Sequence, residues 1–133
     1  ASFGASVSVS NRLAVAATSW VYPHSDSTNG GSALFRAGEL RVAANGGVNA
    51  DARGYLGLPY GAWGPGAGGH GGGGGGYGGR GGDGQGGGAG GLPYGCEDAP
   101  PDPGSGGGGR GGNIGGNGGG SVRVETTGGV TLN

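Results

Sequence analysis

"GGYGGRGGD", residues 75 to 83, decides how the middle of this chain folds. Tyr77, Arg80 and Asp83 interrupt the glycine at intervals of three, and the same phase continues as far as Leu92. A polyproline II helix has three residues per turn. Glycine on two of its three faces would let such helices approach closely and exchange backbone hydrogen bonds. The spacing therefore predicts a bundle of polyglycine II helices, with the other side chains on the outward face.

Two residues of this region depart from the phase. His70 and Gln85 fall between the expected positions, and a loop or a corner at each would explain them. Arg110 and Asn113 begin a second, shorter version of the spacing. A collagen triple helix is disfavoured, because the glycine runs contain no proline inside them.

The composition leaves little for an ordinary hydrophobic core. Of 133 residues 44 are glycine, the formal net charge is −1, and only 19 are Leu, Ile, Val or Phe. That share, about 14%, lies below the roughly 20% of ordinary globular chains. Ordering each glycine costs on the order of 1–2 kcal/mol. Dense backbone hydrogen bonding, close backbone packing or neighbouring chains must compensate, and we expect an assembly rather than a monomer.

Three stretches alternate apolar and polar residues as strands do. They cover residues 5–19, 31–50 and 120–133, with predicted turns at 11–12, 37–38, 45–47 and 128–129. No segment holds a period of 3.6 residues, so helix is excluded. The sequence predicts an all-β fold.

The second and third stretches match each other. Residues 31–32 match 120–121, and after a one-residue slip Leu40 matches Val130 and Val42 matches Leu132. Recurring short strands of this kind predict a β-solenoid, in which each coil buries its apolar row on the next. The alternative is a pair of antiparallel hairpins in a small sandwich.

These patterns divide the chain into three parts. Residues 1–56 are expected to form the first solenoid coils, residues 57–119 a glycine-rich polyglycine II insert, and residues 120–133 a closing coil. Within the insert the pentapeptide GLPYG occurs twice, at 57–61 and 91–95. Each copy joins a proline of fixed φ to a large aromatic, Tyr60 or Tyr94, which predicts corners that anchor the glycine runs. Trp63 adds to the first corner.

Motifs of catalysis and cofactor binding are weak. Glycine-rich phosphate loops need a strand before and a helix after, and a Walker motif needs the lysine that this chain lacks. His24 and His70 stand far apart in sequence, and nothing marks a nucleophile. We therefore expect no enzyme activity and no cofactor. Cys96 is the single cysteine, so an intramolecular disulfide is excluded.

Two binding motifs have simpler explanations. Glu97, Asp98 and Asp102 could offer oxygen ligands to Ca²⁺, but their spacing is irregular and an exposed acidic loop is the expectation, with no metal. Arginine–glycine segments such as the one around Arg80 recruit nucleic acid in other proteins. Here the net charge is negative, so we expect no nucleic-acid partner. No apolar run is long enough for a membrane helix.

The segments GGVNADARGYLG (46–57), GGGYGGRGGDG (74–84) and GGGSVRVETTGGVTLN (118–133) resemble a glycine-rich module of very large extracellular proteins of microbes and protists. The resemblance spans about residues 31 to 133. It implies a parallel β-helix coil that is interrupted by a glycine-rich insert and then resumes, with a structural, filament-forming or adhesive role outside the cell or at its surface. Polyglycine II bundles of phage adhesins and antifreeze proteins suggest the alternative of an adhesin or a glycan- or ice-binding module.

We therefore expect a subunit that assembles head to tail with copies of itself. The closing strand matches a coil that goes on for several residues, and residues 3 to 9 read as a strand that could continue the sheet of a neighbour or exchange with it. The expected assembly residues are Phe3, Val7, Val9, Val130 and Leu132. For the alternative role, the expected sugar-stacking surface consists of aromatic side chains: Tyr55, Tyr60, Trp63, Tyr77 and Tyr94.

Overall fold

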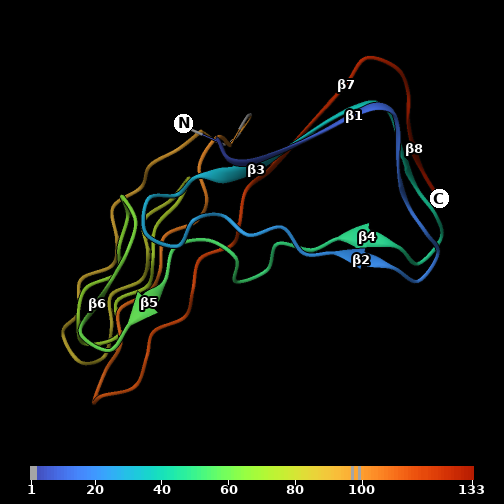
Figure 1. Ribbon diagram of the computed structural model, residues 1–133. Coiled ribbons are helices and arrows are strands. Elements are labelled where there is room, and N and C mark those ends of the chain that lie inside the picture. The colour runs from blue at the N-terminus through green and yellow to red at the C-terminus, as the bar shows by residue number, and fades with distance from the viewer. Residues whose placement is uncertain (1–2, 97, 99) are drawn as a thin grey trace.

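A computed structural model describes residues 3–96, 98 and 100–133 (Figure 1). This part of the chain is all-β and contains no helix, which confirms the expected class. The strands are β1 (Phe3–Val15), β2 (Trp20–Val21), β3 (Ser32–Val42), β4 (Gly47–Val48), β5 (Gly57–Leu58), β6 (Gly61–Ala62), β7 (Val122–Thr126) and β8 (Val130–Leu132). Their sheets are open rather than closed into barrels.

The main sheet is parallel and places β3 between β1 on one side and β7 and β8 on the other. The predicted register is confirmed, since Leu40 pairs with Val130 and Val42 with Leu132. The one-residue slip is also present: the partners Ala33 and Val122 differ by 89 in number, and Leu40 and Val130 by 90. Residues 127–129, between β7 and β8, absorb the extra position.

Parallel pairing overturns the alternative of two antiparallel hairpins. A second small sheet joins β2 and β4, also in parallel, and only the short β5–β6 pair is antiparallel. The predicted turns at 11–12 and 37–38 are wrong, because both positions lie inside continuous strands. From Val9 to Arg12 the first strand gains one residue over its partner, which is a β-bulge that bends the strand without ending it. Gly38 permits the bend, since a Cβ there would lie 2.5 Å from the carbonyl oxygen of Asn11.

A small apolar core lies where these strands meet the second sheet. Val15, Leu40 and Val42 are buried, and Leu13 and Val21 pack against them. Leu13 and Val15 of β1 sit directly beside Leu40 and Val42 of β3, so like side chains stack from strand to strand. This stacking is what the alternation in the sequence predicts.

The described part of the glycine-rich residues 57–119, which is 57–96, 98 and 100–119, forms a lobe of extended segments that lie side by side at one end of the molecule, away from β8 (Figure 1). Segment 71–76 is bonded to four others. Gly73 donates to Gly69, Gly74 donates to Gly82 and accepts from Gly91, and Gly73 accepts from Gly108. A strand in a sheet bonds to two neighbours at most, so segment 71–76 is not a strand of a sheet.

Hydrogen bonds in this lobe recur every three residues. Four pairs of donors, each pair three residues apart, bond to one neighbouring segment each. Gly73 donates to Gly69 and Gly76 to Gly66, and Gly81 donates to Gly91 and Gly84 to Gly88. Gly104 donates to Gly119 and Gly107 to Gly116, and Gly115 donates to Leu58 and Gly118 to Tyr55. In every pair the donors advance by three while the acceptors retreat by three. These four pairs of segments therefore run in opposite directions with a period of three, where strands would have a period of two. Gly68 and Gly71 donate to Gly106 and Gly109, so segments 68–71 and 106–109 have the same period but run in parallel.

Three side chains of the lobe follow this period, and Tyr77 does not. Tyr77 is half-buried and packs against Tyr94, so the expectation of an outward face is wrong for this residue. Arg80, Asp83 and Leu92 are exposed, as the spacing predicts, and Arg80 pairs with Asp83 at 2.9 Å. His70 and Gln85, the two residues out of phase, lie in turns, which confirms the corner interpretation.

The loop before β3 is held by a carboxylate. Asp26 Oδ1 accepts hydrogen bonds from the backbone amides of Asn29 and Thr28 and from the Thr28 hydroxyl. The bond from Asn29, then those from Thr28, lower the pKa of Asp26 below its ordinary range.

Acid will weaken this loop. Because the folded pKa of Asp26 is depressed, its contribution to stability is present above the unfolded pKa and is lost as pH falls below about 4. We expect Asp26→Asn to make the thermal unfolding midpoint less dependent on pH between about pH 5 and 2. Calorimetry at several pH values measures this, with Asp51→Asn as a control at another exposed turn. Equal acid sensitivity of wild type and Asp26→Asn would contradict the assignment.

Candidate assembly surface

The two edges of the main sheet carry most of the expected assembly residues. On the β7–β8 edge Val130 and Leu132 are 54% and 70% exposed. On the opposite edge Val7 is 45% exposed and Val9 is half-buried. The backbone of Phe3 pairs with Ser32, while its side chain lies outside the described residues. The predicted residues thus divide between the two edges, and β1 itself pairs with β3 of the same chain.

Each exposed side chain belongs to a row that crosses the sheet. The three rows, each read from β1 through β3 to the outer edge, are Val7–Phe35–Val124, Leu13–Leu40–Val130 and Val15–Val42–Leu132. Sequence reasoning missed Val124 as an edge residue, although it is 39% exposed. Its match to Phe35 in the aligned stretches is the signal that could have found it. Apolar rows therefore reach both edges of the sheet.

Charged residues also pair across the same strands. Arg12 and Glu39 approach to 3.0 Å, Arg36 and Glu125 to 2.8 Å, and Arg123 and Glu125 to 2.9 Å. The hydrogen bond from Arg36 lowers the pKa of Glu125 below its ordinary range. Exposed pairs of this kind contribute little stability, but they disfavour registers that place like charges side by side.

The aromatic residues in the lobe and beside it separate into two groups. Tyr55 is buried, and Tyr77 packs edge-on against Tyr94 with ring centroids 4.9 Å apart. The Tyr94 hydroxyl donates to the carbonyl of Pro103 and accepts from Ser105. Desolvation by burial raises the pKa of all three hydroxyls. These residues anchor the lobe.

Tyr60 and Trp63 are different, because they are 76% and 46% exposed. Of the two expected roles, corner anchor and surface aromatic, the exposure of Tyr60 contradicts the first, since an anchor would be buried against a neighbouring segment. In the second GLPYG copy Pro103 and Ser105 bond the Tyr94 hydroxyl, whereas in the first copy Gly109 and Gly115 bond only the backbone of Leu58 and leave the Tyr60 ring exposed.

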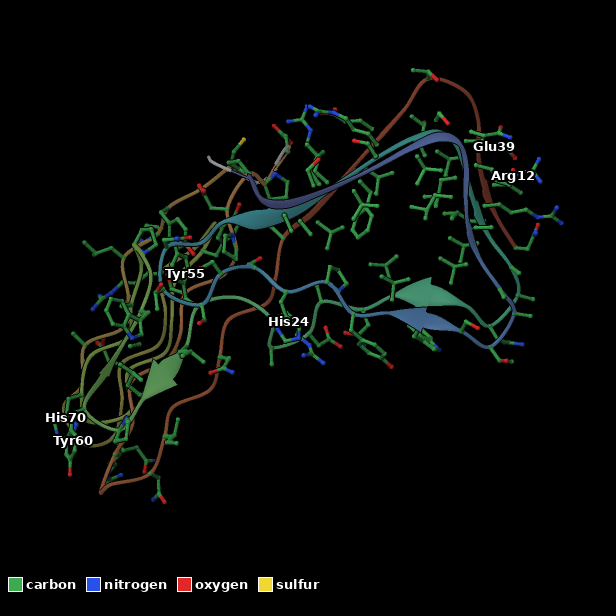
Figure 2. All side chains as sticks on the ribbon, viewed as in Figure 1. Arg12, His24, Glu39, Tyr55, Tyr60 and His70 are labelled. Atoms are coloured by element: carbon green, nitrogen blue, oxygen red, sulfur yellow. The ribbon has the colours of Figure 1, made fainter. Side chains whose placement is uncertain are left out.

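The remaining candidates do not come together. His24 contacts the side chain of Arg53, while His70 packs against Tyr60 at the far end of the lobe (Figure 2). Glu97 lies outside the described residues, and among those described no group of three His, Cys, Asp or Glu side chains could hold a metal ion. Asp98 and Cys96 are exposed.

Comparison with known proteins identifies no relative: no protein-family model, curated protein or solved structure matches this chain. Within the described residues no helix has the length and apolar character needed to cross a bilayer.

Proposed function

We propose that this chain is a structural subunit of an extracellular or cell-surface filament, in which copies stack head to tail through the edges of a β-solenoid. A polyglycine II bundle is inserted between the second and third coils. The single observation that carries the proposal is the repeated parallel register, because the same apolar row occurs in β1, in β3 and in β7–β8.

The offset after the bulge of β1 supports the solenoid, whereas before it the partners lie 29 and then 28 residues apart, as in Phe3–Ser32 and Val7–Phe35. Leu13 of β1 pairs with Leu40 of β3, 27 residues later, and Trp20 of β2 pairs with Gly47 of β4, also 27 residues later. From Arg12 onward both sheets therefore advance by the same number of residues, as they do when successive coils stack. The chain leaves this stack after Leu56, which donates to Ser27, and returns at Gly120, which donates to Ala50.

The hydrogen bonds of the lobe support the polyglycine II bundle. A period of three residues and more than two bonded neighbours are properties of packed three-fold helices and not of strands. Backbone amides that form hydrogen bonds with neighbouring segments on several sides compensate for the missing apolar core. The bundle is then a stiff side arm on each subunit.

The sheet edges support head-to-tail stacking. If β1 of a second copy continues the register beyond β7–β8, its Val7, Leu13 and Val15 lie on Val124, Val130 and Leu132. The same alignment places the second copy's Arg12 beside Gly129 and its Ser8 beside Glu125, so no like charges meet. Contacts between two different edges are heterologous, and they give open filaments when the rotation does not close.

Cysteine cross-linking tests both the assembly and its register. In Cys96→Ser protein, Ala14→Cys and Thr131→Cys are separated within one chain by β3, because both residues pair with Arg41. Two strand spacings, about 9.6 Å, exceed the reach of a disulfide. In the stacked register the two cysteines of different copies are direct neighbours, so we expect oxidation to give a ladder of covalent multimers on denaturing gels.

The matched control is Ala16→Cys with Thr131→Cys, which is two residues out of register and should not form the ladder. Electron microscopy of the unmodified protein provides the independent measurement. Chains that stay monomeric at high concentration, without fibres, would overturn the proposed function. Fibres that cross-link equally in both variants would overturn the register alone.

A further inference from the structure

The two copies of the pentapeptide GLPYG place their tyrosines in different surroundings. In the second copy Tyr94 is bonded to Pro103 and Ser105 and anchors the lobe. In the first copy Tyr60 is 76% exposed, and its hydroxyl has no such partner. An anchoring role explains the position of Tyr94 and does not explain that of Tyr60. Tyr60 is also the most exposed of the large hydrophobic side chains among the described residues.

Tyr60 does not stand alone at the tip of the lobe. Its ring contacts that of His70, with centroids 5.3 Å apart and planes tilted by 48° (Figure 2). Figure 2 places both residues at the end of the lobe farthest from the main sheet. His70 is one of the two residues that leave the three-residue phase to occupy a turn.

Backbone hydrogen bonds bring a cation to the same tip. Gly109 donates to Leu58 at 2.8 Å and accepts from Gly71 at 2.9 Å, so the turns that carry Arg110, Tyr60 and His70 are adjacent. A Cβ on Gly86 would lie 3.1 Å from Arg110 Nε, which places the turn of Gln85 beside the guanidinium.

The guanidinium is available. None of the ion pairs among the described residues involves Arg110, and its side chain is exposed. Asn113 donates its amide to the Arg110 carbonyl across the turn at 3.1 Å, which holds the backbone of this turn. Arginine presents a planar fork of donors that matches a carboxylate.

We propose that this tip, formed by Tyr60, His70, Gln85 and Arg110, binds an acidic glycan. A sugar ring lies with its C–H face on the exposed Tyr60 ring, whose face is electron-rich. The uronate carboxylate of the same or the next sugar pairs with Arg110, and the hydroxyls bond to Gln85 and His70. A nucleic acid would demand several cations to neutralise its phosphates, and this tip has one arginine in a chain of net charge −1.

Binding of an oligogalacturonate of six sugars, measured by titration calorimetry at low ionic strength, tests the proposal. We expect Tyr60→Ala and Arg110→Gln each to lower the affinity by about tenfold or more, which corresponds to roughly 1.4 kcal/mol. Tyr60→Phe should retain binding, since the ring is kept. A neutral glucose oligomer of the same length should bind more weakly, because it offers no carboxylate.

Tyr22→Ala is the matched control. Tyr22 is also exposed, at 52%, and lies beside an arginine, with Arg53 5.5 Å from its ring, but it follows β2 in the other half of the molecule. Its removal should leave the affinity unchanged. No measurable binding, an equal loss in Tyr22→Ala, or tighter binding of a single-stranded oligonucleotide would overturn the proposal. Thermal unfolding of each variant checks that the lobe stays folded, and none of these outcomes depends on filament formation.

Discussion

Gly81→Ala will unfold the glycine-rich lobe, whereas Gly82→Ala, one residue further, will leave it intact. A Cβ on Gly81 would collide with the carbonyl oxygen of Gly74, while nothing lies within 4 Å of a Cβ on Gly82. Neither residue has the positive φ that would strain an alanine. The two substitutions are chemically identical and differ only in what surrounds them.

The expected changes in the free energy of unfolding have opposite signs for Gly81→Ala and Gly82→Ala. Overfilling a packed interior costs about 1–3 kcal/mol when side chains can shift. Here the obstacle is backbone, and Gly74 also donates to Gly82 and accepts from Gly91. Moving it breaks further hydrogen bonds at about 1 kcal/mol each, so we expect a loss of roughly 3 kcal/mol or more for Gly81→Ala. Gly82→Ala restricts only the unfolded chain and should gain about 0.4–1 kcal/mol.

Urea unfolding, combined with hydrogen exchange of amides in residues 66–91, measures the difference. Two further neighbouring pairs repeat the comparison, since Gly115 and Gly118 would meet backbone while Gly116 and Gly119 face open space. If both members of each pair destabilise the lobe equally, the close packing of glycine backbones in this lobe is wrong.

Leu40→Ala will cost the sheet about 2–5 kcal/mol, the range for a buried leucine whose site cannot collapse. Leu40 is 7% exposed and lies in the small cluster with Val15 and Val42. A core this small has few side chains with which to refill the cavity. We expect the variant to be largely unfolded at 37 °C.

Leu132→Ala separates stability from assembly. Leu132 is 70% exposed at the outer edge, so its loss should change the unfolding free energy of the dilute chain by less than about 0.5 kcal/mol. It should nevertheless raise the concentration at which filaments form, because the proposed contact with Val15 of the next copy is removed. Denaturant unfolding and light scattering give the two readouts. Equal loss of stability in both variants would contradict the placement of Leu132 at an open edge.

Local spacing predicts the strand register well. The match of Leu40 with Val130 and of Val42 with Leu132 follows from the residue pattern alone, because stacked parallel strands place like residues at like positions. The corners at His70 and Gln85 are predictable for the same reason, as interruptions of a period.

Spacing fails where the outcome depends on a partner distant in sequence. Residues 11–12 and 37–38 resemble turns locally, yet each strand continues because its neighbour accepts a bulge. Likewise Tyr60 and Tyr94 share one pentapeptide and differ only in what lies opposite them, which no local pattern records.

The sequence by itself determined the all-β class, the strand register and the three-residue spacing of the glycine-rich segments, because a period is a property of neighbours along the chain. Only the tertiary structure decided which tyrosine is buried, which glycines could accept a methyl group and which edges stay open. Those outcomes follow from contacts between segments that are distant in sequence. In a lobe of glycine backbones the contacting and the open positions carry the same residue, so the sequence does not distinguish them.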